Sequence, residues 1–122
     1  MRQLILAPLV SLLLLLVSSV QAHHSFAMFD KTKLVTVKGV VSKVEWGNPH
    51  VFIFLDVTDA KGKKAQYAIE CNSPNVLMRT GWKAGTVKVG QTISIALYPL
   101  RDGRPGGLLD KVTLANGTTL KG

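Results

Sequence analysis

The chain has 122 residues, a hydrophobic fraction of 47% and a formal net charge of +8 at pH 7. This length suits one domain with its own core. Because Cys71 is the only cysteine, an internal disulfide is excluded and the core must supply the stability. A basic surface attracts polyanions, although the longest run of like charge is the group of lysines within residues 61–64.

The first 22 residues have the pattern of a cleavable secretory signal peptide. Arg2 gives a basic start, an apolar run covers 4–17, and small side chains lead to Ala22. The run is shorter than the roughly 20 residues that a membrane-spanning helix needs. We therefore expect a signal-peptide helix over 1–22 and no stable membrane anchor after cleavage. The mature domain, 23–122, would be periplasmic or secreted, and the loss of Arg2 would lower its net charge from +8 to +7.

The mature chain begins with a short leader, residues 23–30. We expect the leader to pack onto the domain, because Phe26 and Phe29 would otherwise lie in water. A valine-rich first strand follows at 34–46. Its apolar side chains change phase after Gly39, which predicts a bulge or sharp bend there. A long, bent first strand is what a small closed barrel requires.

The rest of the chain alternates short apolar segments with turns. A helix is predicted after the third strand, with Ser73 as its N-cap, Pro74 at its first position and its end near Gly81. In the third strand the two-residue period puts Cys71 on the same face as Tyr67, which favours a buried structural thiol over a redox or metal-binding one. The predicted elements are, in order, strands at 51–57 and 65–71, the helix, and strands at 92–97 and 108–114.

This order of elements predicts the fold class. Three strands, a short helix and two further strands follow one another as in the OB-fold, a five-stranded Greek-key barrel. We therefore predict an all-β protein, a small five-stranded OB-like barrel with one short helix between strands three and four, preceded by the signal-peptide helix. A sandwich-like sheet of the same strands is the alternative that the pattern leaves open.

Short motifs occur along the mature chain in this order: His23-His24-Ser25-Phe26, Trp46, Asn48-Pro49-His50, Ser73-Pro74, Arg79, Gly81-Trp82 and Arg101-Asp102-Gly103. Together they resemble a family of small exported bacterial proteins that is known only as a domain of unknown function. The resemblance implies export and a β-barrel-like domain, and it implies no established activity. Tyr67 stands where that family favours Trp, and Gln91 stands where it favours Asp, so the resemblance gives neither position a role.

The three histidines form one candidate metal site. Cleavage after Ala22 would make His23 the first residue, which then offers its α-amine and its ring as two ligands. His50 offers a third, and this T-shaped histidine brace suits Cu(II), with His24 as a spare ligand. A cut after Ser19 would abolish the site. In the alternative interpretation the paired histidines are a tolerated polar start and His50 is a half-buried side chain beside the Asn-Pro turn.

A second candidate site lies in the basic loop between the last two strands, Arg101 to Arg104. In OB-folds this loop often borders the ligand face, and Trp46 and Tyr98 would supply stacking surface beside it. The alternative is a turn with solvated arginines and core aromatics. The candidate ligand-binding residues are Trp46, Asn48, Arg79, Arg101 and Arg104.

Two functional hypotheses follow, and neither involves catalysis. The sequence has no recognisable Ser/His/Asp spacing, no paired-carboxylate signature and no phosphate-binding glycine loop. The first hypothesis is an exported binding module for an anionic envelope polymer or a partner protein, with nucleic acid excluded because of the expected location. The second is a copper-binding protein that uses the histidine brace, and copper is the one cofactor that the sequence suggests.

Overall fold

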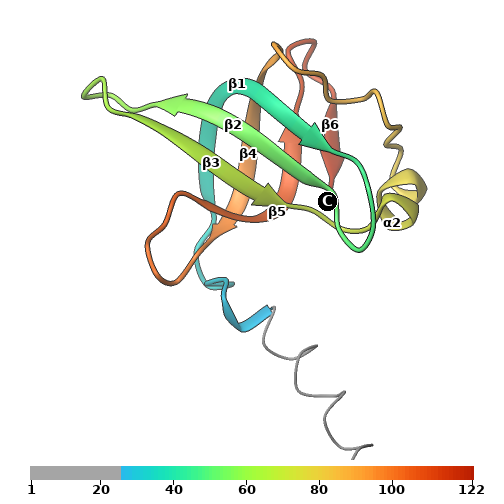
Figure 1. The fold of residues 1–122 in the computed structure, drawn as a ribbon, viewed down its shortest axis with the longest axis horizontal. Coiled ribbons are helices and arrows are strands. Elements are labelled where there is room, and N and C mark those ends of the chain that lie inside the picture. The colour runs from blue at the N-terminus through green and yellow to red at the C-terminus, as the bar shows by residue number, and fades with distance from the viewer. Residues whose placement is uncertain (1–25) are drawn as a thin grey trace, which may run out of the picture.

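A computed structural model describes residues 26–122 of the chain, which form a closed five-stranded β-barrel with one short helix (Figure 1). The predicted fold class is therefore confirmed. The predicted signal peptide, together with His23 and His24, lies outside the described residues. No helix within 26–122 is long and apolar enough to cross a membrane. The elements are β1 (Val35–Glu45), β2 (Phe52–Thr58), β3 (Lys64–Glu70), α2 (Pro74–Arg79), β4 (Thr92–Pro99), β5 (Gly106–Thr113) and β6 (Thr119–Lys121).

The long strand β1 allows the sheet to curve, because its first half pairs with β4 and its second half with β2. Gly39 and Val40 pair with both neighbours. The register shifts between Val41 and Lys43, so the bulge lies a few residues beyond the predicted position. Gly39 serves a different purpose there: a Cβ on it would lie 2.2 Å from the backbone oxygen of Asp56. Only glycine allows the two strands to approach so closely.

Closure comes from a parallel pairing between β3 and β5, in which Ala68–Glu70 lie beside Gly106–Leu108. The full order of strands is β3-β2-β1-β4-β5-β6. β6 was not predicted from the sequence. It has only three residues and pairs with the end of β5, so it is too short to show a two-residue hydrophobic period.

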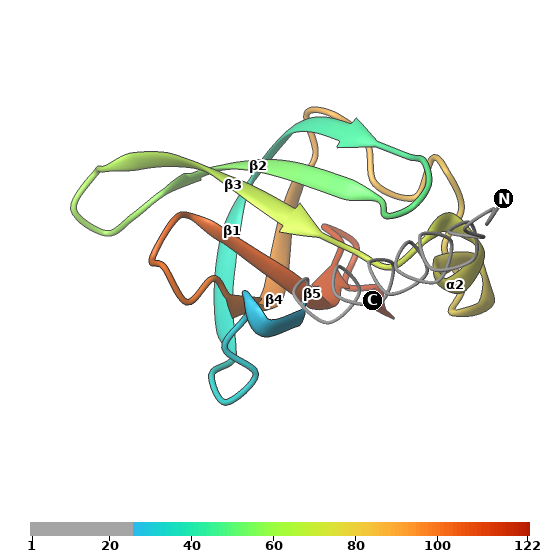
Figure 2. The same cartoon turned by 60° about the horizontal axis from the view of Figure 1, so that its bottom comes forward.

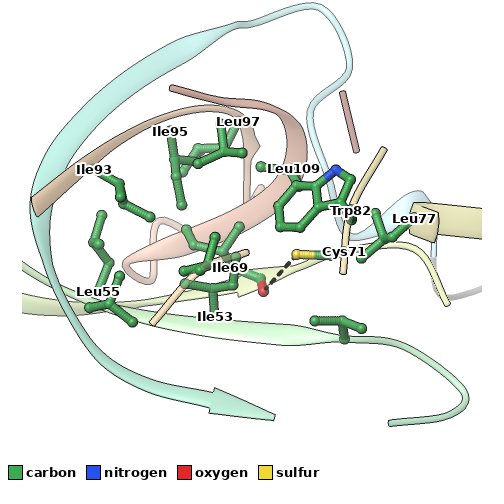
Figure 3. Packing of buried hydrophobic residues seen from close by; sticks show 14 of the residues in the cluster. Ile53, Leu55, Ile69, Cys71, Leu77, Trp82, Ile93, Ile95, Leu97 and Leu109 are labelled. Carbon is green, nitrogen blue, oxygen red and sulfur yellow. Dashed lines mark hydrogen bonds between the residues drawn. The ribbon is translucent and has the colours of Figure 1, made fainter. Parts of the chain in front are cut away.

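Alternate side chains of each strand point inward and build the core (Figure 3). On β2 Ile53 and Leu55 of this face are fully buried, and so are the facing side chains of β4. Cys71 is 1% exposed beside them, and burial raises the pKa of its thiol well above the ordinary value. The prediction of a buried thiol is thus confirmed. The fully buried side chains include Val51, Ile53, Leu55, Ile69, Ile93, Ile95, Leu97 and Val112.

The helix α2 covers one end of the barrel (Figure 1). It begins as predicted, because the Ser73 hydroxyl accepts a hydrogen bond from the Val76 N–H at 3.4 Å. Leu77 of α2 is fully buried, and Trp82 beyond the helix is 2% exposed. The Trp82 indole N–H donates to the Lys121 carbonyl of β6 at 2.7 Å, which ties the segment after the helix to the C-terminal strand. This end of the core is therefore closed.

Candidate ligand-binding cleft

Within residues 26–122, the opposite end of the barrel has no such cover. The turn between β2 and β3 and the loop between β4 and β5 both project from the side of the barrel away from α2 (Figures 1 and 2). Between them lies a cleft of about 510 Å³, which we call the open-end cleft. Small-molecule sites usually measure about 300–1,000 Å³, so the cleft is large enough for a ligand. It is lined by Val35, Val57, Asp59, Lys63, Ala65, Tyr67, Leu97, Pro99, Leu100, Gly103, Arg104, Pro105 and Gly106.

The floor of the open-end cleft is the continuation of the core. Val57 follows Leu55 on the inner face of β2, and Tyr67 precedes Ile69 on the inner face of β3, at the two-residue spacing of a strand. Leu55 and Ile69 are fully buried, whereas Val57 and Tyr67 are only half-buried. The apolar inner face therefore extends beyond the buried part of the core. Its last side chains, an aromatic ring and aliphatic groups, are exposed to the cleft.

Charged side chains form the rim. The Asp59 carboxylate accepts hydrogen bonds from the backbone N–H groups of Lys61 and Lys63, at 2.8 and 2.9 Å, and so shapes the β2–β3 turn. Across the cleft, the Arg104 guanidinium donates to Asp102 at 2.7 Å. Hydrogen bonds from the Arg104 backbone and side chain lower the pKa of Asp102. Asp59 at the rim and Asp102 beside it therefore both already hold hydrogen-bond partners.

Three lysines lie in or beside the β2–β3 turn, and of these Lys63 lines the open-end cleft. Within residues 26–122, Lys61, Lys63 and Lys64 form no ion pair, and all three are exposed. The rim therefore carries an excess of positive charge above an apolar floor. This arrangement suits a ligand that combines an apolar body with an anionic group.

Arg101, the other arginine of the β4–β5 loop, contacts the leader. The Arg101 side chain donates to the Ala27 carbonyl at 3.0 Å, and its backbone N–H donates to the Met28 carbonyl at 2.8 Å. Arg101 thus fixes the leader beside the β4–β5 loop and does not line the cleft. The leader packs as expected only in part: Phe29 is 3% exposed, whereas Phe26 is 58% exposed.

Of the two aromatic residues that were predicted to lie beside the basic loop, Trp46 and Tyr98, only Tyr98 lies there. Trp46 packs on the core at the α2 end, where it contacts the cluster around Trp82 and Val87 and leaves no free cavity. Tyr98 does lie next to the loop, on β4. Its hydroxyl donates to Asp110 at 3.2 Å, and the negative charge of Asp110 raises the pKa of Tyr98. The structure therefore does not place Trp46 beside the basic loop.

The remaining candidate residues lie in the β1–β2 loop and on α2, outside the cleft. The His50 Nδ1 lies 2.6 Å from Glu70 Oε1, and both side chains are partly buried. Asn48 is exposed and precedes a cis peptide bond to Pro49, and Arg79 is exposed at the end of α2. Within the described residues, no three side chains of metal-binding type come together. The amino-terminal ligands of the predicted brace lie outside this part of the chain.

The chain belongs to the family of unknown function DUF6152, whose model matches residues 12–111. No curated protein matches it. Among solved structures it is similar to a mitochondrial single-stranded DNA binding protein from S. cerevisiae, Rim1, with a TM-score of 0.46 and 14% sequence identity. That match covers 74% of this chain and 97% of the other.

One expectation about partners is corrected by this comparison. The exclusion of nucleic acid does not stand, since a solved structure similar to this chain is that of a single-stranded DNA binding protein. The exclusion rested on the expected location of the chain and not on any property of its surface. A likeness at 14% identity assigns no partner to this chain in return.

Proposed function

We propose that this chain is a small exported binding module, without catalytic activity, that holds its ligand in the open-end cleft. The observation that carries the proposal is the end of the barrel left open by residues 26–122, where an apolar floor meets the side chains of Arg104 and of Lys63, which has no ion pair within those residues. The ligand that fits combines an apolar body with an anionic group. Export is supported by the signal-peptide pattern of residues 1–22. Binding is favoured over catalysis because Asp59, the carboxylate among the described residues that line the cleft, already accepts hydrogen bonds within its own turn.

The test uses anilinonaphthalene sulfonate, a fluorescent probe with an aromatic body and one sulfonate. We expect it to bind the purified protein with enhanced fluorescence. Ala65→Trp places a large side chain on the floor and should weaken binding at least tenfold. Lys63→Glu combined with Arg104→Glu should weaken it similarly, because the rim then repels the sulfonate.

The matched control is Lys83→Glu combined with Lys88→Glu. It changes the net charge by the same amount at exposed positions that do not line the cleft. Circular dichroism verifies that each variant is folded. Unchanged binding in Ala65→Trp, or equal losses in the rim and control variants, would show that the open-end cleft is not the site.

Copper binding is the second candidate function, and the contact between His50 and Glu70 favours it. A carboxylate on Nδ1 fixes the ring and leaves Nε2 as the metal ligand, as in many metal sites. Cleavage after Ala22 would supply the amine and ring of His23, and such nitrogen ligands suit Cu(II). We expect one tightly bound Cu(II) by calorimetry, lost when an additional N-terminal Met is retained and in His50→Ala. Uptake that survives both changes would exclude the brace.

A further inference from the structure

The strand β3 has one edge that is only partly covered. Along its other edge β2 pairs with every residue of Lys64–Glu70. β5 pairs only with Ala68–Glu70. The first half of β3 therefore has no strand partner on this side within residues 26–122. Because Ala65 and Tyr67 line the open-end cleft, this free edge runs along the cleft.

The hydrogen bonds show which backbone groups face the gap. The Ala68 N–H donates to the Pro105 carbonyl, on the β5 side of the strand, at 3.4 Å. Backbone groups in an antiparallel pair alternate in direction with a period of two. The N–H and C=O groups of Lys64 and Gln66 must therefore point the same way as those of Ala68, into the gap. The groups of Ala65 and Tyr67 point toward β2.

We propose that this free edge of β3 binds an extended acidic peptide segment, which adds a strand beside Lys64 and Gln66. The inference deepens the proposed function, because alternate side chains of the added strand would enter the open-end cleft above Tyr67. An uncovered strand edge is a template for another chain, and strand addition combines main-chain hydrogen bonds with pockets for alternate side chains. Here the free edge of β3 offers the main-chain groups, and the open-end cleft beside it offers the pocket.

The charge of the edge determines the kind of peptide. Lys61, Lys63 and Lys64 lie at or next to this half of β3, and none has an ion pair within the described residues. Edge pairing with a second copy of this chain would bring these lysines close to those of the partner, and like charges across a strand pair repel. Acidic side chains on the added strand instead complement them.

The experiment uses an acetylated and amidated seven-residue peptide of alternating Glu and Val. Amide hydrogen exchange of the purified protein is followed by NMR with and without this peptide at saturation. We expect exchange of the Lys64 and Gln66 amide protons to slow at least tenfold. The Ala65 and Tyr67 amides, which already face β2, should change little. A peptide with Lys in place of Glu should bind at least tenfold more weakly.

Two controls separate strand addition from simple binding in the cleft. The first is the same peptide with N-methyl groups on the amides that would face β3, which removes its donors. The second compares Gln66→Pro with Gln66→Ala. Both variants lose the side-chain contact to Ser42, but only proline removes the N–H that faces the gap. We expect the methylated peptide and the proline variant each to weaken binding at least tenfold, and the alanine variant to bind normally.

The outcomes distinguish the two proposals. Strand addition is overturned if the methylated peptide binds as well as its parent, or if no peptide slows exchange at Lys64 and Gln66. It is also overturned if a twelve-residue oligothymidine binds at the cleft and the peptide does not. In each case retained binding of anilinonaphthalene sulfonate, still sensitive to Ala65→Trp, leaves the proposed function in place. Should Gln66→Pro fail to fold, the methylated peptide decides the question.

Discussion

The close approach of β1 to β2 at Gly39 gives the most direct test of the fold that positions the cleft. In Gly39→Ala the new Cβ would lie 2.2 Å from the backbone oxygen of Asp56 and 3.1 Å from Leu55 Cγ. Close carbon–oxygen contacts in proteins are about 3.3 Å or longer. One strand must therefore move by roughly 1 Å relative to the other. The obstacle is a backbone atom of a paired strand, so rotation of a side chain cannot relieve it.

The cost can be estimated from known effects. Overpacking a core position costs about 1–3 kcal/mol, and weakening one ladder hydrogen bond costs about 1 kcal/mol. We therefore expect Gly39→Ala to lower the free energy of unfolding by about 3 kcal/mol, a large part of the roughly 5–15 kcal/mol of a small domain. At about 4–8 °C per kcal/mol, the Tm should fall by roughly 12–24 °C. Ligand binding in the open-end cleft should also weaken, because Val57 of its floor pairs with Gly39.

The assay is urea unfolding followed by fluorescence of the two tryptophans, with Gly47→Ala as the control. A Cβ at Gly47 would meet no atom within 4 Å, and this glycine has no positive φ. We expect the control variant to be unchanged or about 0.4–1 kcal/mol more stable, because alanine restricts the unfolded chain. Equal stability of Gly39→Ala and the wild type would refute the strand packing described for β1.

Three further predictions concern side chains outside the cleft. Trp82→Phe should cost about 2 kcal/mol in urea unfolding, because it removes the indole hydrogen bond to β6 and some buried volume; a loss below about 0.5 kcal/mol would contradict that contact. Cys71 should resist iodoacetamide in the native state at pH 8 and react after unfolding, because it is buried and burial raises the pKa of its thiol. In a Tyr67→Phe background, Asp110→Asn should lower the pKa of Tyr98 toward its usual value of about 10, followed by absorbance at 295 nm. The raised pKa of Tyr98 also means that the contact stabilises the fold below about pH 10 and that this stabilisation is lost as the pH rises through the folded-state pKa.

The fold was largely predictable because its signals are local. The two-residue period of the strands, the cap formed by Ser73 and Pro74 and the chain order together predict the barrel. Two details were not predictable from the same signals. The phase change after Gly39 correctly indicated an irregular strand, but the bulge lies between Val41 and Lys43. The glycine itself is required by a contact with Asp56, and a contact between strands is invisible in one segment of sequence.

The site was less predictable, because it depends on which ends of strands share one end of the barrel. Arg104 was singled out from its basic loop, and it does line the cleft. Trp46 was grouped with the same loop on the basis of residue type alone, and it packs at the other end of the core. The floor residues Val57 and Tyr67 were taken for ordinary strand residues. Their pattern is the same as that of the buried core, and only the missing cover distinguishes them.

The difference between the two ends of the barrel explains why function is expected at one of them. The apolar inner face extends along the whole barrel, and at the α2 end Leu77 and Trp82 remove it from water. At the other end Tyr67 and Val57 continue the same face, and no helix within residues 26–122 covers them. Each square ångström of apolar surface left in water forgoes about 25 cal/mol, so a bound segment that covers this floor recovers stabilisation that the chain alone does not obtain. The free edge of β3 beside the floor supplies hydrogen-bonding groups for that segment, and the lysines next to it disfavour pairing with another copy of the chain.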